Sequence, residues 1–127
     1  MRLGFLAFSF AVILFEFSAA SCAHHVIERA SEFGLASWYG ADHQGRLTAS
    51  GEPFDMNEMT AAHRTLPMNC IVRVKSVSTG QIVSVRINDR GPYGKGRIID
   101  LSYQAAKRLG IIEKGTDQVE IQVVSLP

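Results

Sequence analysis

The sequence has few of the residues that mark disulfide-rich, metal-binding or nucleic-acid-binding proteins. Its 127 residues include 2 cysteines, 4 histidines and 1 tryptophan, and 13 basic side chains nearly balance 12 acidic ones. Two cysteines define no disulfide framework, and no cysteine or histidine recurs at the spacing of a metal site. Near-neutral charge with scattered Lys and Arg argues against a nucleic-acid partner. We therefore expect no metal, no cofactor and no nucleic acid.

The only long hydrophobic run lies at the N-terminus. Residues 3–15 are almost wholly apolar, follow the basic Arg2 and lead into small residues at positions 18–21. The run is shorter than the roughly 20 residues of a membrane-spanning helix and is typical of a signal peptide. We predict a signal peptide over residues 1–21 and export of the protein; the alternative is a buried N-terminal helix.

Cys22 directly follows these small residues, as the lipidated cysteine does in a bacterial lipobox. Ala19 stands where that pattern usually has Leu, so cleavage nearby to give a soluble periplasmic protein is the alternative. Lipidation of Cys22 would leave Cys70 without a partner, whereas an unmodified Cys22 allows a Cys22–Cys70 disulfide. Cys70 lies in a strand-like run, which favours a buried, inert thiol.

Residues 22–33 mix charged and small side chains without periodicity and are interpreted as a linker that follows the membrane anchor. The remaining residues, 34–127, form a single domain, because the chain is too short for two. This domain is predicted to begin near Gly34.

The domain has the pattern of a small β protein. Alternating apolar residues predict strands at 36–40, 71–75, 82–88 and 119–123, and a short apolar run predicts another at 98–101. Residues 60–63 fit a helical turn or a strand, and 42–59 form a long loop of the kind that often carries function. Ser102 is expected to cap a helix that ends at Leu109 before Gly110. Five or six strands with one helix favour a closed barrel.

Asp89 is the most informative ionisable residue. It continues the two-residue period of Val83, Val85 and Ile87, which places it on the inward, apolar side at the end of a strand. Partial desolvation there favours the protonated acid and suits proton donation, although a neighbouring Arg90 or Arg97 would favour the ionised form. The alternative is a carboxylate that pairs with an arginine or caps the following Gly-Pro turn.

Other candidates surround it in the sequence. Glu52 lies in the long loop, and His63 follows two alanines that permit close approach of a ligand. A single histidine is more often structural, so both roles stay open for His63. Trp38 and Tyr39 offer a flat platform for a sugar ring or pack in the core. Arg90 and Asp100 are the remaining residues predicted to bind substrate.

Five sequence blocks occur in order: GLASWYG at 34–40, TASGE at 48–52, TAAHRTLP at 60–67, VRINDRGP at 85–92 and GRIIDLS at 96–102. Together they resemble the rare lipoprotein A (RlpA) family over about Gly34 to Val124. The resemblance implies a mainly β fold, a six-stranded double-psi β-barrel with one or two short helices. It implies an endolytic lytic transglycosylase acting on peptidoglycan glycan strands that lack stem peptides.

The family's proposed functional residues fall on Glu52, His63 and Asp89 of this sequence. The resemblance also implies a Gram-negative envelope, with Ala23 after the cysteine compatible with sorting to the outer rather than the inner membrane. Many members carry a C-terminal SPOR domain that binds peptidoglycan. The sequence up to Pro127 shows none, so targeting to division sites by that route is not expected.

A lytic transglycosylase cuts the bond between N-acetylmuramic acid (MurNAc) and N-acetylglucosamine (GlcNAc) without water. An acid protonates the glycosidic oxygen, and the 6-hydroxyl of MurNAc closes a 1,6-anhydro ring, so neither a protein nucleophile nor a metal is needed. We assign Asp89 as the acid and then the base, with Glu52 or His63 assisting the 6-hydroxyl or holding the sugar. The alternative is an expansin-like lipoprotein that binds peptidoglycan without cutting it.

Overall fold

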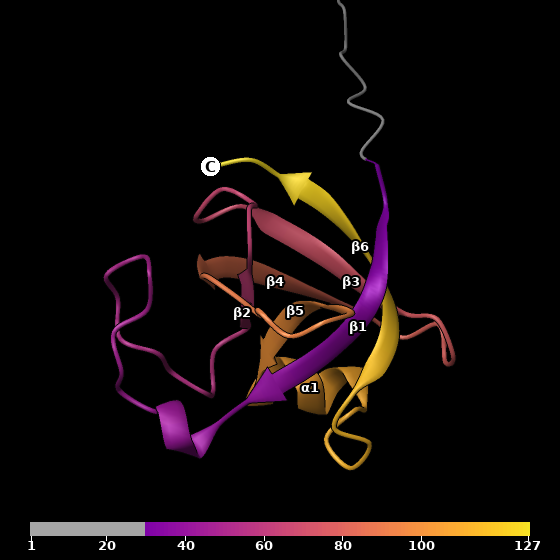
Figure 1. Ribbon diagram of the computed structural model, residues 1–127, viewed down its shortest axis with the longest axis horizontal. Coiled ribbons are helices and arrows are strands. Elements are labelled where there is room, and N and C mark those ends of the chain that lie inside the picture. Colours follow the sequence, from indigo (N-terminus) through magenta and orange to yellow (C-terminus); the bar gives the residue numbers. More distant parts are fainter. Residues whose placement is uncertain (1–29) are drawn as a thin grey trace, which may run out of the picture.

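Six β-strands close into a barrel in the order β1-β5-β2-β4-β3-β6 (Figure 1). The computed structural model describes residues 30–127; the predicted signal peptide and Cys22 lie outside the described residues. The strands are β1 (Glu32–Tyr39), β2 (Thr60–His63), β3 (Ile71–Ser76), β4 (Ile82–Asp89), β5 (Arg97–Ser102) and β6 (Asp117–Ser125). One 3-10 helix, η1 (Ala41–His43), follows β1, and one α-helix, α1 (Tyr103–Leu109), follows β5.

The barrel combines two parallel strand pairs, β1 with β5 and β2 with β4, with four antiparallel pairs. Closure leaves none of these six strands with an unpaired edge, which removes a route to aggregation. The predicted mainly β, six-stranded fold with short helices is confirmed. Among residues 30–127, no helix is long and apolar enough to cross a membrane.

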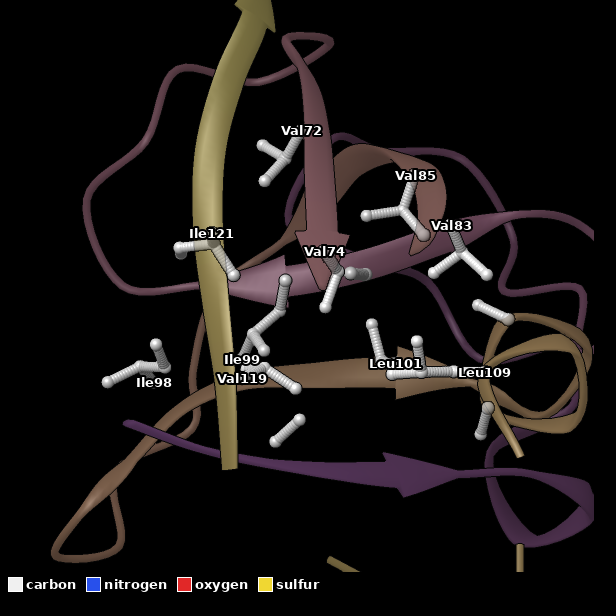
Figure 2. Close-up of a cluster of buried hydrophobic side chains, with 14 of the residues drawn as sticks. Val72, Val74, Val83, Val85, Ile98, Ile99, Leu101, Leu109, Val119 and Ile121 are labelled. Atoms are coloured by element: carbon white, nitrogen blue, oxygen red, sulfur yellow. The ribbon is translucent and has the colours of Figure 1, made fainter. Parts of the chain in front are cut away.

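The barrel interior is filled by the apolar side chains that alternate with polar ones along the strands. Val83, Val85 and Ile87 of β4 point inward, and the side chain of each is at least nine-tenths buried. Complete burial of such a side chain contributes roughly 1.5–3 kcal/mol. Figure 2 shows the aliphatic core, which also contains Val72, Val74, Ile98, Ile99, Leu101, Leu109, Val119 and Ile121.

The predicted helix termini are confirmed. The Ser102 hydroxyl accepts a hydrogen bond from the Ala105 N–H, which satisfies one of the free donors of the first turn. Gly110 has φ 84°, and its N–H donates to the carbonyls of Ala106 and Lys107. A residue with a Cβ would be strained in this left-handed conformation.

The structure defines three features that the sequence left open: the start of the first strand, the conformation of residues 60–63 and the start of the long loop. β1 starts at Glu32 and pairs with β6 from that residue onward, so Gly34, near which the domain was predicted to begin, lies inside the first strand. Residues 60–63 are a strand, β2. The long loop begins with η1 and extends to one side of the barrel (Figure 1). Cys70 has no disulfide partner among residues 30–127 and is fully buried, and burial raises the pKa of its thiol.

Candidate active site

One row of paired residues crosses four neighbouring strands of the barrel. Ser37 of β1 pairs with Asp100 of β5, Asp100 pairs with Ala62 of β2, and Ala62 pairs with Asp89 of β4. Residues paired across strands lie on the same face of a sheet. The row therefore brings two carboxylates to one face, with a small alanine between them.

This face is the outside of the barrel. The preceding residue of β2, Ala61, pairs with Leu101 and Ile87, and all three are fully buried in the apolar core. Because successive side chains of a strand point to opposite faces, Ala62 and its partners point away from the core.

The predicted inward orientation of Asp89 is thus wrong. The pairing of β2 with β4 has a register shift in which Ala61 opposes Ile87 and Ala62 opposes Asp89. Asn88 is the extra residue of this bulge and is itself 1% exposed. A bulge reverses the alternation after it, so Asp89 leaves the face of Ile87 and joins Ala62 on the outside.

A pocket of about 350 Å³ lies over this row of residues. It contains Asp89 and the four residues predicted to bind substrate, which come from β1, from β5 and from the end of β4. Its lining consists of Trp38, Tyr39, His43, Ala62, Asp89, Arg90, Arg97 and Asp100.

Three lining residues, His43, Ala62 and Arg97, were not among the predicted site residues. His43 belongs to the long loop that was flagged as functional, and its ring lies 5.2 Å from that of Tyr39. Arg97 lies in the block GRIIDLS, three residues before Asp100. From the sequence, Arg97 was expected only as a cation near Asp89.

Backbone donors hold one oxygen of Asp89. Its Oδ1 accepts hydrogen bonds from the N–H of Ala49, at 3.0 Å, and from its own neighbour Arg90, at 2.9 Å. Its Oδ2 has no hydrogen-bond partner within residues 30–127. With Oδ1 committed as an acceptor, the proton of the acid form belongs on Oδ2, the oxygen that is free to reach a ligand.

Asp100 is held in a similar way. Its Oδ1 accepts a short hydrogen bond from the Ser37 hydroxyl, and the Arg97 guanidinium lies 3.7 Å from the same oxygen. Arg97 also donates to the Ser37 hydroxyl at 3.0 Å. In the described part of the chain, nothing bonds to the second oxygen of Asp100. Each acidic residue of the pocket therefore has one fixed and one available oxygen.

The hydroxyl of Tyr39 is buried and has no hydrogen-bond partner among the described residues. Burial raises the pKa of this hydroxyl, and the negative charges of Asp89 and Asp100 raise it further. Tyr39 therefore stays neutral and able to donate a hydrogen bond at any physiological pH. Its ring packs against that of Phe54, with centroids 4.5 Å apart.

Arg90 is anchored at the end of β2. Its Nη1 donates to the carbonyls of His63, at 3.1 Å, and Leu66, at 2.8 Å. These bonds use one nitrogen of the guanidinium and keep the positive charge at the pocket wall.

His63 does not join the pocket. It pairs with Ile99, whose side chain is in the core, so His63 faces the barrel interior, opposite to Ala62. Its Nδ1 lies 3.1 Å from the N–H groups of both Thr65 and Leu66 and accepts from them. Its Nε2, 2.9 Å from Oε2 of Glu32, then carries the proton and donates a hydrogen bond to that carboxylate. Both ring nitrogens therefore have structural partners.

Glu52 lies beside the pocket rather than in its wall. Its loop contacts Asp89 through Ala49, but the Glu52 carboxylate turns to Arg86, with Oε1 2.6 Å from Nη1. This hydrogen bond lowers the pKa of Glu52, and bonds with Asn88 and Ser50 lower it further, although burial acts in the opposite direction. Glu52 is thus held as an anion, which makes it a poor proton donor at neutral pH.

A second hollow lacks this combination of groups. A pocket of about 130 Å³ over β3 and β6 contains none of the predicted site residues; it is lined by Arg73, Lys75, Ile82, Glu120 and Gln122. Within residues 30–127, no group of three or more His, Cys, Asp or Glu side chains is placed to hold a metal ion.

The barrel fold and the side chains of its pocket indicate the class of protein to which the chain belongs. The family model for lytic transglycolase matches residues 31–121, so the chain belongs to that family. Its relatives include the endolytic peptidoglycan transglycosylase RlpA of Vibrio cholerae, 50% identical over 96 residues that cover 76% of this chain and 36% of the relative. RlpA of Pseudomonas aeruginosa is 52% identical over 89 residues, covering 70% and 26%. The resemblance to rare lipoprotein A is confirmed, and the chain spans about a third of these relatives or less.

Solved structures support the fold alone. The Streptomyces papain inhibitor superposes with a TM-score of 0.61 at 22% identity, covering 75% of this chain and 94% of the inhibitor. The Clavibacter michiganensis expansin gives the same TM-score at 22% identity, covering 77% of this chain and 52% of the expansin.

Proposed function

We propose that the protein is an endolytic lytic transglycosylase that cuts MurNAc–GlcNAc bonds of peptide-stripped glycan strands and leaves 1,6-anhydroMurNAc ends. The observation that carries this proposal is the carboxyl group of Asp89, with one oxygen fixed by two N–H donors and the other available in the pocket. The family relationship over residues 31–121 supports the reaction class.

The reaction needs an acid and a held sugar. Asp89 donates its Oδ2 proton to the glycosidic oxygen as the bond to C1 of MurNAc breaks, and the 6-hydroxyl of the same ring bonds to C1. Positioned acid catalysis of this kind contributes roughly 10²–10⁴-fold to the rate. No metal or protein nucleophile takes part in these steps.

Aromatic and cationic groups in the pocket suit a sugar substrate. The Trp38 ring packs edge-on against Tyr103, with centroids 5.6 Å apart, which fixes the ring as one wall of the pocket. Arg90 adds a fixed positive charge that can pair with the lactyl carboxylate of a MurNAc residue without a stem peptide. This pairing would explain a preference for stripped strands.

The test is a digest of intact sacculi and of amidase-stripped glycan strands by the purified full chain, with product ends read by mass spectrometry. Anhydromuramic ends that disappear with Asp89→Asn support the proposal, and Asp55→Asn serves as the matched control. Reducing ends would identify a hydrolase instead. Retained binding to sacculi without any product would favour the expansin-like binding protein.

We also propose that the protein is a lipoprotein of the cell envelope, anchored at Cys22 and facing the periplasm, with the outer membrane favoured over the inner. The small residues before Cys22 and the Ala23 after it support this placement. Labelling with a radioactive or alkyne fatty acid should mark the wild-type chain but not Cys22→Ser. Release of an unlabelled wild-type chain into the periplasmic fraction would identify a soluble protein instead.

A further inference from the structure

The row of residues across β5, β2 and β4 places a second acid opposite Asp89. Ala62 pairs with Asp89 on one side and with Asp100 on the other, so the two carboxylates are separated by one intervening strand. Two strand spacings correspond to roughly 9–10 Å between their Cα atoms. Both side chains line the same pocket.

The residue between them leaves room for a substrate. Ala62 is the floor of the pocket, and its methyl group is the smallest side chain that keeps the strand conformation. A sugar ring above Ala62 would have one carboxylate at each edge. Inverting glycosidases likewise separate their two carboxyl groups, in their case so that a water can enter between acid and base.

The two carboxylates have different electrostatic surroundings. Oδ1 of Asp89 is bound by two uncharged N–H groups, whereas Oδ1 of Asp100 is bound by the Ser37 hydroxyl and lies 3.7 Å from the Arg97 cation. Each carboxylate thus has one oxygen held by neighbouring groups and the other directed to a substrate placed between them in the pocket.

We propose that Asp100 is the second catalytic carboxylate, the base that takes the proton of the MurNAc 6-hydroxyl. This inference rests on the proposed function. As O6 bonds to C1 and the bond from C1 to the GlcNAc oxygen breaks, the O6 proton passes to Asp100 and the Asp89 proton passes to the leaving oxygen. Exchange with water afterwards reprotonates Asp89 and deprotonates Asp100, so that no other reactant is consumed.

Glu52 and His63 do not compete for this role. The Glu52 carboxylate is bound by Arg86 outside the pocket wall, and both nitrogens of His63 are used on the opposite face of β2. Tyr39, the pKa of whose hydroxyl is raised by burial and by the charges of both carboxylates, lines the same pocket as Asp89 and Asp100.

Two substrates separate the roles of acid and base. The full chain is assayed on stripped glycan strands and on an aryl glycoside of MurNAc, whose phenolate leaves without protonation. Asp89→Asn should lose at least 100-fold on strands but keep most of its activity on the aryl glycoside. Asp100→Asn should lose at least 100-fold on both, because the 6-hydroxyl must still lose its proton.

Two features of the design guard against a variant that fails to fold. Asparagine at position 100 keeps the hydrogen-bond acceptor for Ser37, and each variant is compared with wild type in thermal unfolding and in sacculus binding. Asp100→Ala is also assayed with added formate, which should restore at least tenfold of the anhydro product if a missing carboxylate base is the only defect. Asp42→Asn, an exposed acid outside the pocket, should match wild type.

Three outcomes would overturn the role of Asp100 or the proposed function. Asp100→Asn with activity within threefold of wild type on both substrates overturns the role of Asp100 and leaves the proposed function intact. Loss of product without formate rescue in Asp100→Ala assigns Asp100 a structural role and also overturns the inference. A wild-type chain that makes no anhydro product from either substrate overturns the proposed function, and this inference with it.

Discussion

The N–H of Ala49 donates a hydrogen bond to Oδ1 of Asp89 over 3.0 Å and so attaches the long loop to the end of β4. A second bond joins the same segments, from the Ser50 N–H to the Asn88 carbonyl at 3.1 Å. The loop that the sequence marks as functional therefore acts by positioning the proposed acid.

This arrangement predicts that the position of the Asp89 carboxyl matters as much as its presence. Asp89→Glu keeps the acid but moves it by one methylene group, which breaks its alignment with the two N–H donors. A misplacement of about 1 Å can lower a rate by about 100-fold. We expect kcat for anhydro product from glycan strands to fall by about that factor, with little change in KM. Equal activity of wild type and Asp89→Glu would contradict the positioning role of Ala49.

Tyr39→Phe should separate stability from activity. The Tyr39 hydroxyl is buried without a partner in residues 30–127, so its removal leaves no other group unpaired, and an unpaired buried polar group costs roughly 1–3 kcal/mol. We expect the free energy of unfolding to stay the same or rise by about 1 kcal/mol. Activity should stay within about threefold of wild type, because the buried hydroxyl does not reach the sugar. Thermal unfolding and the glycan-strand assay, run on the same preparation, test both expectations; a destabilised or inactive variant would contradict them.

Much of the fold could be predicted because its signals are local. The alternation of Val83, Val85 and Ile87 and the capping of α1 by Ser102 depend on neighbours within a few residues. The bulge at Asn88 is different, because it exists only where β4 pairs with Ala61 and Ala62, more than twenty residues away. That single extra residue moved Asp89 to the outer face, against the prediction.

The site likewise combines features set by the local sequence with features set by the pairing of distant strands. Trp38, Tyr39, Arg90 and Asp100 were named from their local context, but only closure of the barrel brings them together around Asp89. His63 looked equally promising beside two alanines. Its position one residue after Ala62 places it on the other face of β2, which the sequence could not show without the strand pairing.

His63 is therefore expected to matter for stability. In His63→Ala the N–H groups of Thr65 and Leu66 lose their acceptor, at a cost of roughly 0.5–1.5 kcal/mol for each lost hydrogen bond, and the barrel interior loses a side chain that is 4% exposed. Denaturant unfolding should show a loss of at least 2 kcal/mol, while the activity of the folded fraction stays within about threefold of wild type. Glu32→Gln, which keeps an acceptor for Nε2, is the matched control and should cost less than 1 kcal/mol. A stable but inactive His63→Ala protein would assign His63 to the chemistry instead.

The ion pair of Glu52 with Arg86 predicts a pH dependence of stability. Because the pKa of Glu52 is lowered in the folded state, chiefly by the Arg86 hydrogen bond, the unfolded chain binds more protons in acid. The pair thus stabilises the fold above the ordinary Glu pKa of about 4.3, and this contribution disappears as the pH falls through the lowered folded-state pKa. The side chains of Arg86 and Glu52 are 29% and 38% exposed, so we expect only about 0.5 kcal/mol at neutral pH.

Thermal unfolding of wild type and Glu52→Gln between pH 2 and pH 7 measures this term directly. The difference in stability should be largest at pH 6–7, shrink steadily in acid and weaken in high salt, because a partly exposed pair is screened. Glu58, whose carboxylate lies 3.8 Å from Arg86 and is 56% exposed, provides the matched control, and Glu58→Gln should show a smaller difference at every pH. A difference for Glu52→Gln that persists undiminished at pH 2 would show that Glu52 stabilises the loop by packing rather than by its charge.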